Sequence, residues 1–387
     1  MDVSAPSGRN SVVHGRVVTP DEVVDDGRVD VDGGRITAIG PADSAPHVAA
    51  ETVDAAGGWI VPGFIDLQVN GGAGIDITSS PERMGELAAD LVAQGVTAFL
   101  PTVVTAPADR RTAALAAWAA TAVPERAAAP LGLHFEGPFI SPERLGAHPR
   151  RYVLEPSGAE IDGWSREAGL AVVTLAPERP GADDLIATLV ERGVVVAIGH
   201  TDATEEQCRR AIALGATYLT HLYNAMRPFG HRDPGPVGAT LGGDGLIAGM
   251  IADGVHVADT ALRLAWRALG PGRITLVTDA VAARGGPAGS RLGAVDVGGA
   301  VDGAVRTAAG VLAGSVLTLD GALRHLVRVT GCSVPDAVAT VTSTPAAVLG
   351  LADRGALRGG ARGDIVVLDA ELRVSAVVVG GMLAWRS

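Results

Sequence analysis

Two apolar runs separated by a helical pattern decide the fold, AVVTLAPE at Ala171–Glu178 and VVVAIGHT at Val194–Thr201. Each run begins with nearly continuous Ala, Val, Leu or Ile and lacks the alternation of a half-exposed strand, which indicates a strand buried on both faces. The residues between them, Asp183–Arg192, have the apolar spacing of an amphipathic helix. Together these segments predict a strand–helix–strand unit of a parallel sheet covered by helices.

The same unit repeats on both sides of residues 171–201. We expect eight strands, at Gly63–Asn70, Val96–Val104, Leu131–Pro138, Ala171–Glu178, Val194–Thr201, Thr217–Ala225, Ile247–His256 and Ile274–Ala280. Helical patterns fall between most of them, at Pro81–Gln94, Asp183–Arg192, Thr204–Leu214 and Asp259–Leu269. Eight such units predict an α/β protein with a closed (β/α)8 TIM barrel rather than an open doubly wound sheet. No GxGxxG motif opens a helix after the first strand, which disfavours nucleotide binding.

Other patterns flank the barrel region. A glycine-rich insert at Val281–Leu312 is expected to form hairpins, and helical patterns follow at Val316–Thr330 and Val334–Leu349. Short strand patterns lie near both chain ends, at Val12–Val18, Gly27–Asp32, Arg35–Ile39, Glu51–Ile60, Asp364–Leu368 and Val374–Trp385. We therefore predict a small discontinuous β-sandwich domain built from residues 1–62 and 350–387, and a catalytic barrel over residues 63–349.

The composition excludes several classes of function. The net charge of −12 argues against a nucleic-acid partner, which requires a basic face. All 31 basic residues are arginine, so Schiff-base chemistry, a P-loop lysine and a carboxylated lysine bridging two metals are excluded. No run of about 18 apolar residues suggests a membrane span, and Met1–Asn10 lacks the layout of a signal peptide. We therefore expect a cytoplasmic protein without membrane contacts.

Polar side chains collect where the predicted strands end. They are Gln68, Asn70, Glu136, His200, His221, His256 and Asp279. The active site of a (β/α)8 barrel lies at this end of the strands. Any one of these residues could be a core histidine or a helix cap, but so many buried polar groups on one rim would be costly without a function.

The most informative subset combines one carboxylate with two imidazoles. Glu136, His200 and His221 would leave a fourth position open for water, which is typical of a catalytic zinc site. A bound metal lowers the pKa of such a water to about 7. Asp279 is placed to accept its proton and pass it to the leaving group, although Thr-Asp-Ala could also be a turn. His134, two positions before Glu136, points to the same face of its strand and is interpreted as a buried residue that supports the ligands, with direct metal binding as the alternative.

Several of these segments closely resemble the N-acetylglucosamine-6-phosphate deacetylases of the amidohydrolase superfamily. The matching motifs are PGFID at Pro62–Asp66, HFEGP at His134–Pro138, GHT at Gly199–Thr201, THLYNAM at Thr220–Met226, DGVH at Asp253–His256, VTDA at Val277–Ala280 and LAGS at Leu312–Ser315. The resemblance extends in order from about Val12 to Trp385. THLYNAM is its most specific part, whereas PGFID is shared by many amidohydrolases.

The resemblance implies hydrolysis of N-acetylglucosamine 6-phosphate to glucosamine 6-phosphate and acetate, in amino-sugar metabolism. Glu136, His200 and His221 would hold one divalent metal, expected to be zinc with iron as an alternative, and Asp279 would be the general base and then acid. The implied substrate contacts are Gln68, Asn70, Ala147, His148, Asn224, Ala225, Arg232, His256 and Leu312. His148 would also assist catalysis from a loop.

The resemblance also implies a homodimer in which Arg232 reaches the neighbouring subunit's site. Arg227 and His231 lie close to it in the sequence, which leaves open the cation nearest the phosphate. A guanidinium suits this role because it offers planar, two-point recognition of phosphate oxygens.

One departure from related enzymes concerns the number of metals. Amidohydrolases with two metals carry His-x-His after the first strand, where this chain has Gln68-Val69-Asn70. Neutral amides are poorer ligands than imidazole, so we expect a single catalytic metal.

Three alternatives stay open at this point. One is a deacetylase for N-acetylgalactosamine 6-phosphate, and another is a different amidohydrolase reaction such as cyclic amide hydrolysis or base deamination. The third is a non-catalytic barrel used as a scaffold, which should have lost a metal ligand or the aspartate.

Overall fold

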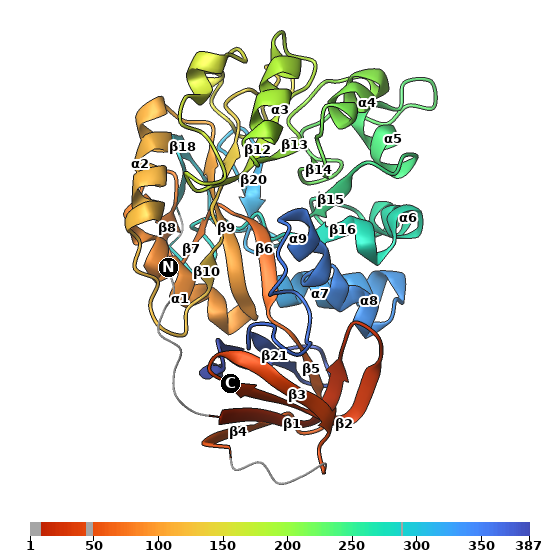
Figure 1. Cartoon of the computed structure of the whole chain (residues 1–387). Coiled ribbons are helices and arrows are strands. Elements are labelled where there is room, and N and C mark those ends of the chain that lie inside the picture. The colour runs from red at the N-terminus through yellow and green to blue at the C-terminus, as the bar shows by residue number, and fades with distance from the viewer. Residues whose placement is uncertain (1–8, 44–48, 288) are drawn as a thin grey trace.

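A barrel of parallel strands forms the larger part of the molecule (Figure 1). The computed structural model describes residues 9–43, 49–287 and 289–387, so most of Met1–Asn10, on which the prediction about a signal peptide rests, lies outside the described residues. The eight barrel strands pair in parallel in chain order, which confirms the predicted (β/α)8 barrel. They are β6 (Phe64–Val69), β9 (Val96–Val104), β11 (Leu133–Glu136), β12 (Leu170–Leu175), β13 (Val195–Ile198), β14 (Tyr218–Leu219), β15 (Ile247–Met250) and β16 (Ile274–Leu276).

Two smaller features complete the barrel sheet. β10 (Ala129–Pro130) adds a short parallel pairing to β9. A parallel bridge between Val69 and Ala280 brings the end of the first strand beside the segment that follows the last, and this bridge nearly closes the barrel.

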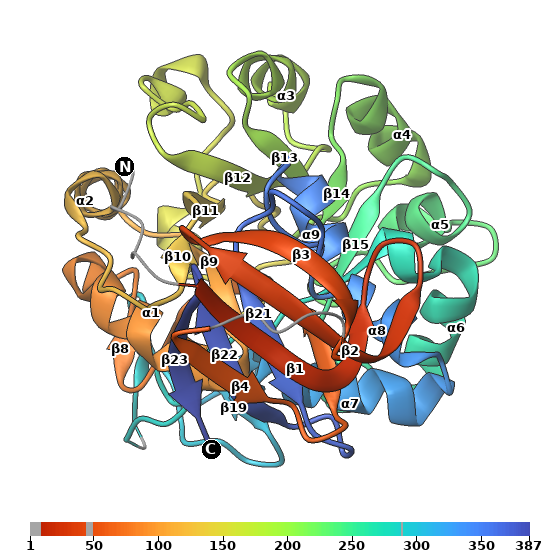
Figure 2. The same ribbon diagram turned by 60° about the horizontal axis from the view of Figure 1, so that its bottom comes forward.

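Helices surround the barrel, as Figure 2 shows when the molecule is viewed nearly along the barrel axis. They are α1 (Met84–Leu91), α2 (Ala108–Ala120), α3 (Ala182–Glu191), α4 (Glu205–Ala213), α5 (Gly235–Leu241), α6 (Asp259–Leu269), α7 (Leu319–Thr330), α8 (Val334–Ala339) and α9 (Ser343–Val348). Short 3₁₀ turns precede and follow α1, so the predicted segment Pro81–Gln94 is helical throughout. None of the described helices is long and apolar enough to cross a bilayer.

One predicted helix is divided in two. The pattern at Val334–Leu349 suggested a single helix, but α8 and α9 are separated at Thr340–Thr342. The hydroxyls of Thr340 and Thr342 donate to the backbone carbonyls of Ala337 and Val338. Such side-chain bonds compete with helix continuation, and Pro345 then lies in the first turn of the new helix, where its missing N–H is tolerated.

A separate sheet contains strands from both ends of the chain. It consists of β1 (Arg9–Val18), β2 (Val23–Asp32), β3 (Arg35–Pro41), β4 (Glu51–Asp54), β5 (Trp59–Pro62), β21 (Ile365–Leu368), β22 (Val374–Val379) and β23 (Met382–Arg386). The antiparallel pairing of β5 with β21 joins the amino-terminal and carboxy-terminal segments. This sheet lies below the barrel in Figure 1 and has its own apolar core, as expected for a small β domain. The exact boundaries at residues 62 and 350 stay a prediction.

Several barrel strands end earlier than the sequence patterns suggested. His200, His221 and Asp279 were placed within strands, but each lies just beyond one, with φ of 48°, 28° and 48°. A left-handed backbone costs a residue with a Cβ about 1–2 kcal/mol, and it turns the chain out of the strand direction. These three positions therefore have strained backbone at the end of the barrel where the active site is expected.

The glycine-rich insert forms hairpins, as predicted. They are β17 (Arg291–Leu292) with β18 (Val295–Asp296), and β19 (Ala304–Arg306) with β20 (Leu312–Ser315). A further small pair, β7 (Gly71–Gly72) with β8 (Ile75–Asp76), follows the first barrel strand. The backbone N–H of Ser315 donates to the carbonyl of Asp279, which holds β20 beside the end of the last strand.

Candidate active site

A cavity of about 380 Å³ opens at the carboxyl ends of the barrel strands. Its lining includes most of the predicted site residues, namely Asn70, Glu136, Ala147, His148, His200, His221, Asn224, Ala225, His256, Asp279 and Leu312. The lining residues that sequence reasoning missed are Gly146, Ile251, Leu292, Arg306, Val311, Ala313 and Gly314. Leu292, Arg306 and Val311 come from the insert, whose hairpins were predicted but whose contacts with the barrel had no signal in the sequence.

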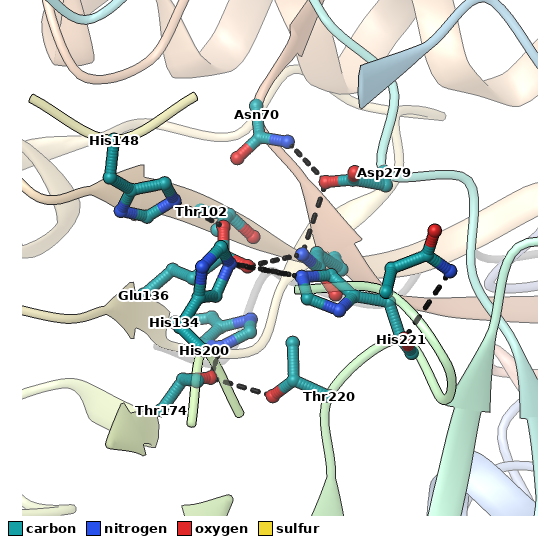
Figure 3. Close-up of polar contacts among 12 residues, drawn as sticks. Asn70, Thr102, His134, Glu136, His148, Thr174, His200, Thr220, His221 and Asp279 are labelled. Atoms are coloured by element: carbon teal, nitrogen blue, oxygen red, sulfur yellow. Dashed lines mark hydrogen bonds and ion pairs between the residues drawn. The ribbon is translucent and has the colours of Figure 1, made fainter. Parts of the chain in front are cut away.

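One carboxylate oxygen lies at the centre of the polar groups in this cavity (Figure 3). The Nε2 atoms of His200 and His221 lie 3.1 and 2.9 Å from Oε1 of Glu136, and 3.2 Å from each other. All three side chains are at most 5% exposed. The structure thus brings together, from β11 and from the loops after β13 and β14, the three residues predicted to bind a metal.

The positions of the ligand atoms fit a cation between them. Nδ1 of His200 lies 3.0 Å from the carbonyl oxygen of Arg144, which can only accept, so Nδ1 carries the proton. Nε2 is therefore the nitrogen of His200 that faces Glu136, and it is the atom of this ring that could bind a cation. Ligands held tetrahedrally at 2.0–2.1 Å from a metal are about 3.3–3.4 Å apart, close to the spacing of these atoms.

The ionisation of the cluster agrees with this interpretation. Burial alone would raise the pKa of Glu136, but contacts with His148, His200 and His221 outweigh it and hold the pKa well below its ordinary value. For His221, burial lowers the pKa, yet the contact with Glu136 raises it by more. The site therefore favours a carboxylate anion with positive charge beside it.

His148 is a second candidate for the third ligand. One ligand atom each from Glu136, His148 and His200 can be chosen so that all three lie within 4.8 Å of one another. However, His148 Nε2 approaches the other carboxylate oxygen, Oε2, at 3.6 Å, while Nδ1 lies 2.8 Å from the hydroxyl of Thr105. His200 and His221 converge on a single oxygen, so the geometry favours His221 as the ligand and leaves His148 facing the cavity beside it.

Asp279 lies across the cavity from this cluster and is held by two amides. Its Oδ1 accepts from Gln68 Nε2 at 3.0 Å and from Asn70 Nδ2 at 2.6 Å. Gln68 also donates to Oε1 of Glu136 at 3.0 Å. Burial, and after it the charge of Glu136, raises the pKa of Asp279 to about 6. A base is most effective when its pKa lies near the working pH, so this carboxylate suits general base catalysis.

The contacts of Gln68 and Asn70 bear on the number of metals. Both residues direct amide N–H groups at carboxylate oxygens in the region where His-x-His would hold a second metal. An N–H donor in that position repels a cation. The arrangement therefore supports a single catalytic metal.

A buried carboxylate holds the strand that carries Gln68 against the Asp279 loop. Oδ2 of Asp66 accepts from the hydroxyl of Thr278 at 2.6 Å, and Oδ1 accepts from the backbone N–H of Gln68 at 3.1 Å. Burial raises the pKa of Asp66 to about 7, even though these hydrogen bonds lower it. Asp66 is therefore a link between the first and last barrel strands that is sensitive to pH.

This link predicts a specific dependence of stability on pH. An unfolded aspartate loses its proton near pH 3.9, whereas folded Asp66 keeps it up to about pH 7. Between these values the folded chain binds the extra proton, so stability present below pH 4 is lost as the pH rises through 7. Relative to Asp66→Asn, the wild-type unfolding free energy should fall by about 1.4 kcal/mol per pH unit in this window. Urea unfolding of both proteins from pH 4 to 8 measures the difference, and parallel curves would contradict the prediction.

His134 lies deeper than the cavity. Its Nδ1 donates to the carbonyl of Leu67 at 3.2 Å, and Nε2 lies 2.7 Å from the hydroxyl of Thr174, which in turn contacts Thr220. Both ring nitrogens are thus engaged in the interior, and burial lowers the pKa of His134 to about 4. The neutral ring beneath Glu136 acts as a support, consistent with its interpretation from the sequence.

The residues expected to bind phosphate divide into two groups. Asn224 and Ala225 line the cavity, whereas Arg232 is exposed and is not among the described residues that line it. Arg227 is engaged by Asp233 at 2.5 Å and by Asp202 at 3.5 Å, so its charge is already paired. Arg306, on β19, is the only arginine among the described lining residues.

A (β/α)8 barrel with a carboxylate–imidazole cluster and a facing aspartate at its strand ends defines a metal-dependent hydrolase of the amidohydrolase type. Comparison with known proteins agrees, because the sequence model of the Amidohydrolase family matches residues 59–383. The chain is 40% identical over 359 residues to N-acetylglucosamine-6-phosphate deacetylase of Rattus norvegicus, covering 88% of this chain and 87% of that protein. Identity to the enzyme of Bacillus subtilis (strain 168) is 35%, with 96% of both chains covered.

Solved structures give the same result. One is a variant of the N-acetyl-D-glucosamine-6-phosphate deacetylase of Mycobacterium smegmatis, solved in complex with N-acetyl-D-glucosamine-6-phosphate. It matches this chain with a TM-score of 0.88 and 36% sequence identity, and the match covers 98% of this chain and 100% of that chain. The enzyme of Thermotoga maritima has a TM-score of 0.88 and 31% identity, with 97% of this chain and 100% of that chain covered. The protein therefore belongs to the amidohydrolase family, in the group of the N-acetylglucosamine-6-phosphate deacetylases.

Proposed function

We propose that the protein hydrolyses the N-acetyl group of N-acetylglucosamine 6-phosphate, releasing acetate and glucosamine 6-phosphate. The observation that carries this proposal is the convergence of Glu136, His200 and His221 on one point, with Asp279 facing the same cavity. Similarity to deacetylases over most of the chain supports the substrate. The scaffold alternative has no support, because all four residues are present.

Glu136, His200 and His221 are proposed to hold one divalent metal per chain, and zinc is the expected ion. Two imidazoles and a carboxylate with an open position form the ligand set of catalytic zinc sites, although Fe²⁺ also accepts these ligands. When bound, such an ion polarises a carbonyl oxygen and makes water more acidic.

Asp279 is proposed to move the proton between water and the leaving nitrogen. Gln68 and Asn70 occupy Oδ1, and no described residue donates a hydrogen bond to Oδ2. Oδ2 can therefore take a proton as water attacks the acetyl carbon, and return it to the nitrogen as the C–N bond breaks. His148, with its pKa lowered to about 4 by burial and by the charge of His200, is neutral and faces the cavity, where its ring can contact the acetyl oxygen.

The phosphate is proposed to bind away from the reacting bond. Asn224 and Ala225 line the cavity, where the backbone of Ala225 is proposed to contact the phosphate. Arg306 of the same chain supplies a positive charge there, although the protein as a whole has a net charge of −12. Arg232 is proposed to complete the site of a neighbouring subunit in a homodimer, for which its exposed position is suitable. Because the phosphate does not react, its contacts with the protein serve to hold the acetyl group in position for hydrolysis. A cytoplasmic location stays an expectation from the sequence.

One experiment tests this assignment. Purified protein should turn over N-acetylglucosamine 6-phosphate, with kcat/KM higher than for unphosphorylated N-acetylglucosamine by about 10²-fold or more, because a charge-assisted contact to phosphate contributes several kcal/mol. Treatment with a chelator should abolish turnover, and Zn²⁺ or Fe²⁺ should restore it. The active species should sediment as a dimer.

The N-acetylgalactosamine 6-phosphate epimer is the matched control substrate. Faster turnover of this epimer would reassign the substrate, and full activity of metal-free protein would overturn the proposed site. A fully active monomer would contradict the role of Arg232.

A further inference from the structure

The backbone that carries Asp279 has a strained conformation just beyond the last barrel strand. The φ angle of Asp279 is 48°, which is left-handed and unfavourable for a residue with a Cβ. Such a conformation persists only where surrounding contacts fix it. The side chain depends on it, because Oδ1 must reach the amides of Gln68 and Asn70 at 3.0 and 2.6 Å (Figure 3). The contacts that hold this backbone therefore bear on the position of the proposed base.

Ser315, the last residue of β20, contacts both peptide groups that flank the Cα of Asp279. Its hydroxyl donates to the carbonyl oxygen of Thr278 at 2.5 Å, and its backbone N–H donates to the carbonyl oxygen of Asp279 at 3.0 Å. The backbone N–H of Leu317 in turn donates to Ser315 Oγ at 3.0 Å. The two carbonyl oxygens lie on the peptide planes whose relative rotation sets φ and ψ of Asp279. Ser315 thus fixes the direction of its Cα–Cβ bond.

The residue before Ser315 allows β20 to come this close. Gly314 has a φ of 86°, and a Cβ there would lie 2.7 Å from the carbonyl oxygen of Asp279 and 2.5 Å from Cγ1 of Val281. Both separations are too short for a carbon atom, so the approach requires glycine. The backbone N–H of Val281 also donates to the carbonyl of Ser315 at 3.1 Å. Main-chain bonds therefore keep β20 beside the loop, and the buried hydroxyl adds the contact with Thr278.

We propose that Ser315 is a positioning residue for the general base, and that its hydroxyl holds Asp279 so that Oδ2 stays available to the cavity. This inference rests on the proposed function, in which Asp279 moves the proton. Without the hydroxyl, the peptide group between Thr278 and Asp279 loses one of its constraints. Rotation of that group turns the Cα–Cβ bond and moves the carboxylate away from the reacting atoms.

Ser315→Ala removes the hydroxyl and leaves the main-chain bonds of β20 in place. For N-acetylglucosamine 6-phosphate, kcat should fall about 10- to 100-fold, because a small displacement of a catalytic group lowers the rate strongly. KM should change by no more than about threefold, since the proton transfer is not part of substrate binding. The metal content should equal that of wild type. Wild-type kcat in this variant would overturn the proposal.

A double variant separates positioning of Asp279 from a general structural role. In the Asp279→Asn background no base remains to be misplaced, so adding Ser315→Ala should lower the residual kcat by no more than about twofold. If Ser315→Ala causes the same loss in both backgrounds, Ser315 does not act through Asp279 and the proposal is wrong.

Ser290→Ala is the matched control within the same insert. The hydroxyl of Ser290 also donates to a backbone carbonyl, that of Pro287 at 2.8 Å, and Ser290 is buried but is not among the described residues that line the cavity. This variant loses an equivalent bond and should keep kcat within about twofold of wild type. A loss as large as that of Ser315→Ala would assign the effect to the insert as a whole and count against the proposal.

Hydrogen exchange tests the same contact without substrate. In wild type the backbone N–H of Asp279 donates to the carbonyl of Gln68 at 3.0 Å. In Ser315→Ala this N–H should exchange at least about tenfold faster, because the loop opens more often. An unchanged exchange rate would refute the positioning role.

Two further outcomes keep the proposals distinguishable. If Ser315→Ala does not fold, Ser315→Cys replaces it, because a thiol is a weaker donor; that variant should show a smaller loss of kcat that again disappears in the Asp279→Asn background. Failure of wild type to hydrolyse the substrate would refute the proposed function, whereas exchange at Asp279 would still decide whether Ser315 holds the loop.

Discussion

Replacing Asp279 with asparagine is expected to lower kcat by about 10³-fold or more, at the upper end of what a general base contributes. Asparagine has nearly the same size and can still accept hydrogen bonds from Gln68 and Asn70 through its carbonyl oxygen, but it cannot take a proton. The wild-type carboxyl, with its pKa raised to about 6 by burial, is ionised at neutral pH. Steady-state kinetics measure the loss, and calorimetric titration of the inactive variant measures substrate binding, which should stay near the wild-type value.

Metal content distinguishes the roles that Asp279 could have. If Asp279 only transfers protons, the Asp279→Asn variant should retain as much metal as wild type. Loss of the metal would show that Asp279 is a ligand, and near-normal turnover would refute its assignment as the base.

Replacing Glu136 with glutamine should remove both metal and activity. A neutral amide is a poor metal ligand. It also lacks the negative charge with which the Glu136 carboxylate pairs with His200 and His221. Wild-type protein should contain about one ion per chain and the variant nearly none. Because a metal contributes several kcal/mol to the transition state, activity should fall by at least about 10³-fold. Elemental analysis after gel filtration, together with kcat/KM, measures both effects.

Glu178→Gln provides the matched control for this experiment. Glu178 also lies near the strand ends, but its carboxylate binds the hydroxyl of Thr201 and the backbone N–H of Asp202, and it is not among the described lining residues. This variant should keep its metal. Equal metal loss in both variants would mean that removing any nearby carboxylate disrupts the site, and full metal retention in Glu136→Gln would refute the ligand assignment.

The fold was largely predictable because its signals are local. Nearly continuous apolar runs such as Val96–Val104 are typical of strands buried on both faces. Their alternation with helices in eight units favours a barrel. The errors lay at segment ends. The pattern at Val334–Leu349 does not show that two threonine hydroxyls interrupt the helix, because their bonds depend on local geometry.

The candidate site was predictable in its members but not in its contacts. Parallel strands must end on one rim, so residues after different strands are brought together whatever the details of packing. The hydrogen bonds that orient them have no sequence pattern. Gln68 donates to both Glu136 and Asp279, which lie 68 and 211 positions further along the chain. Arg306 enters the cavity from an insert whose docking is not encoded in any motif.

By itself, the sequence determined the barrel, the flanking β strands and the identity of the residues at the strand ends, because periodicity and residue type act over short distances. Only the tertiary structure decided that Nε2 of His200 faces a carboxylate and that one oxygen of Asp279 is occupied by two amides. These properties depend on which donor meets which acceptor. Such pairings arise only when distant segments of chain pack together in a place that excludes water.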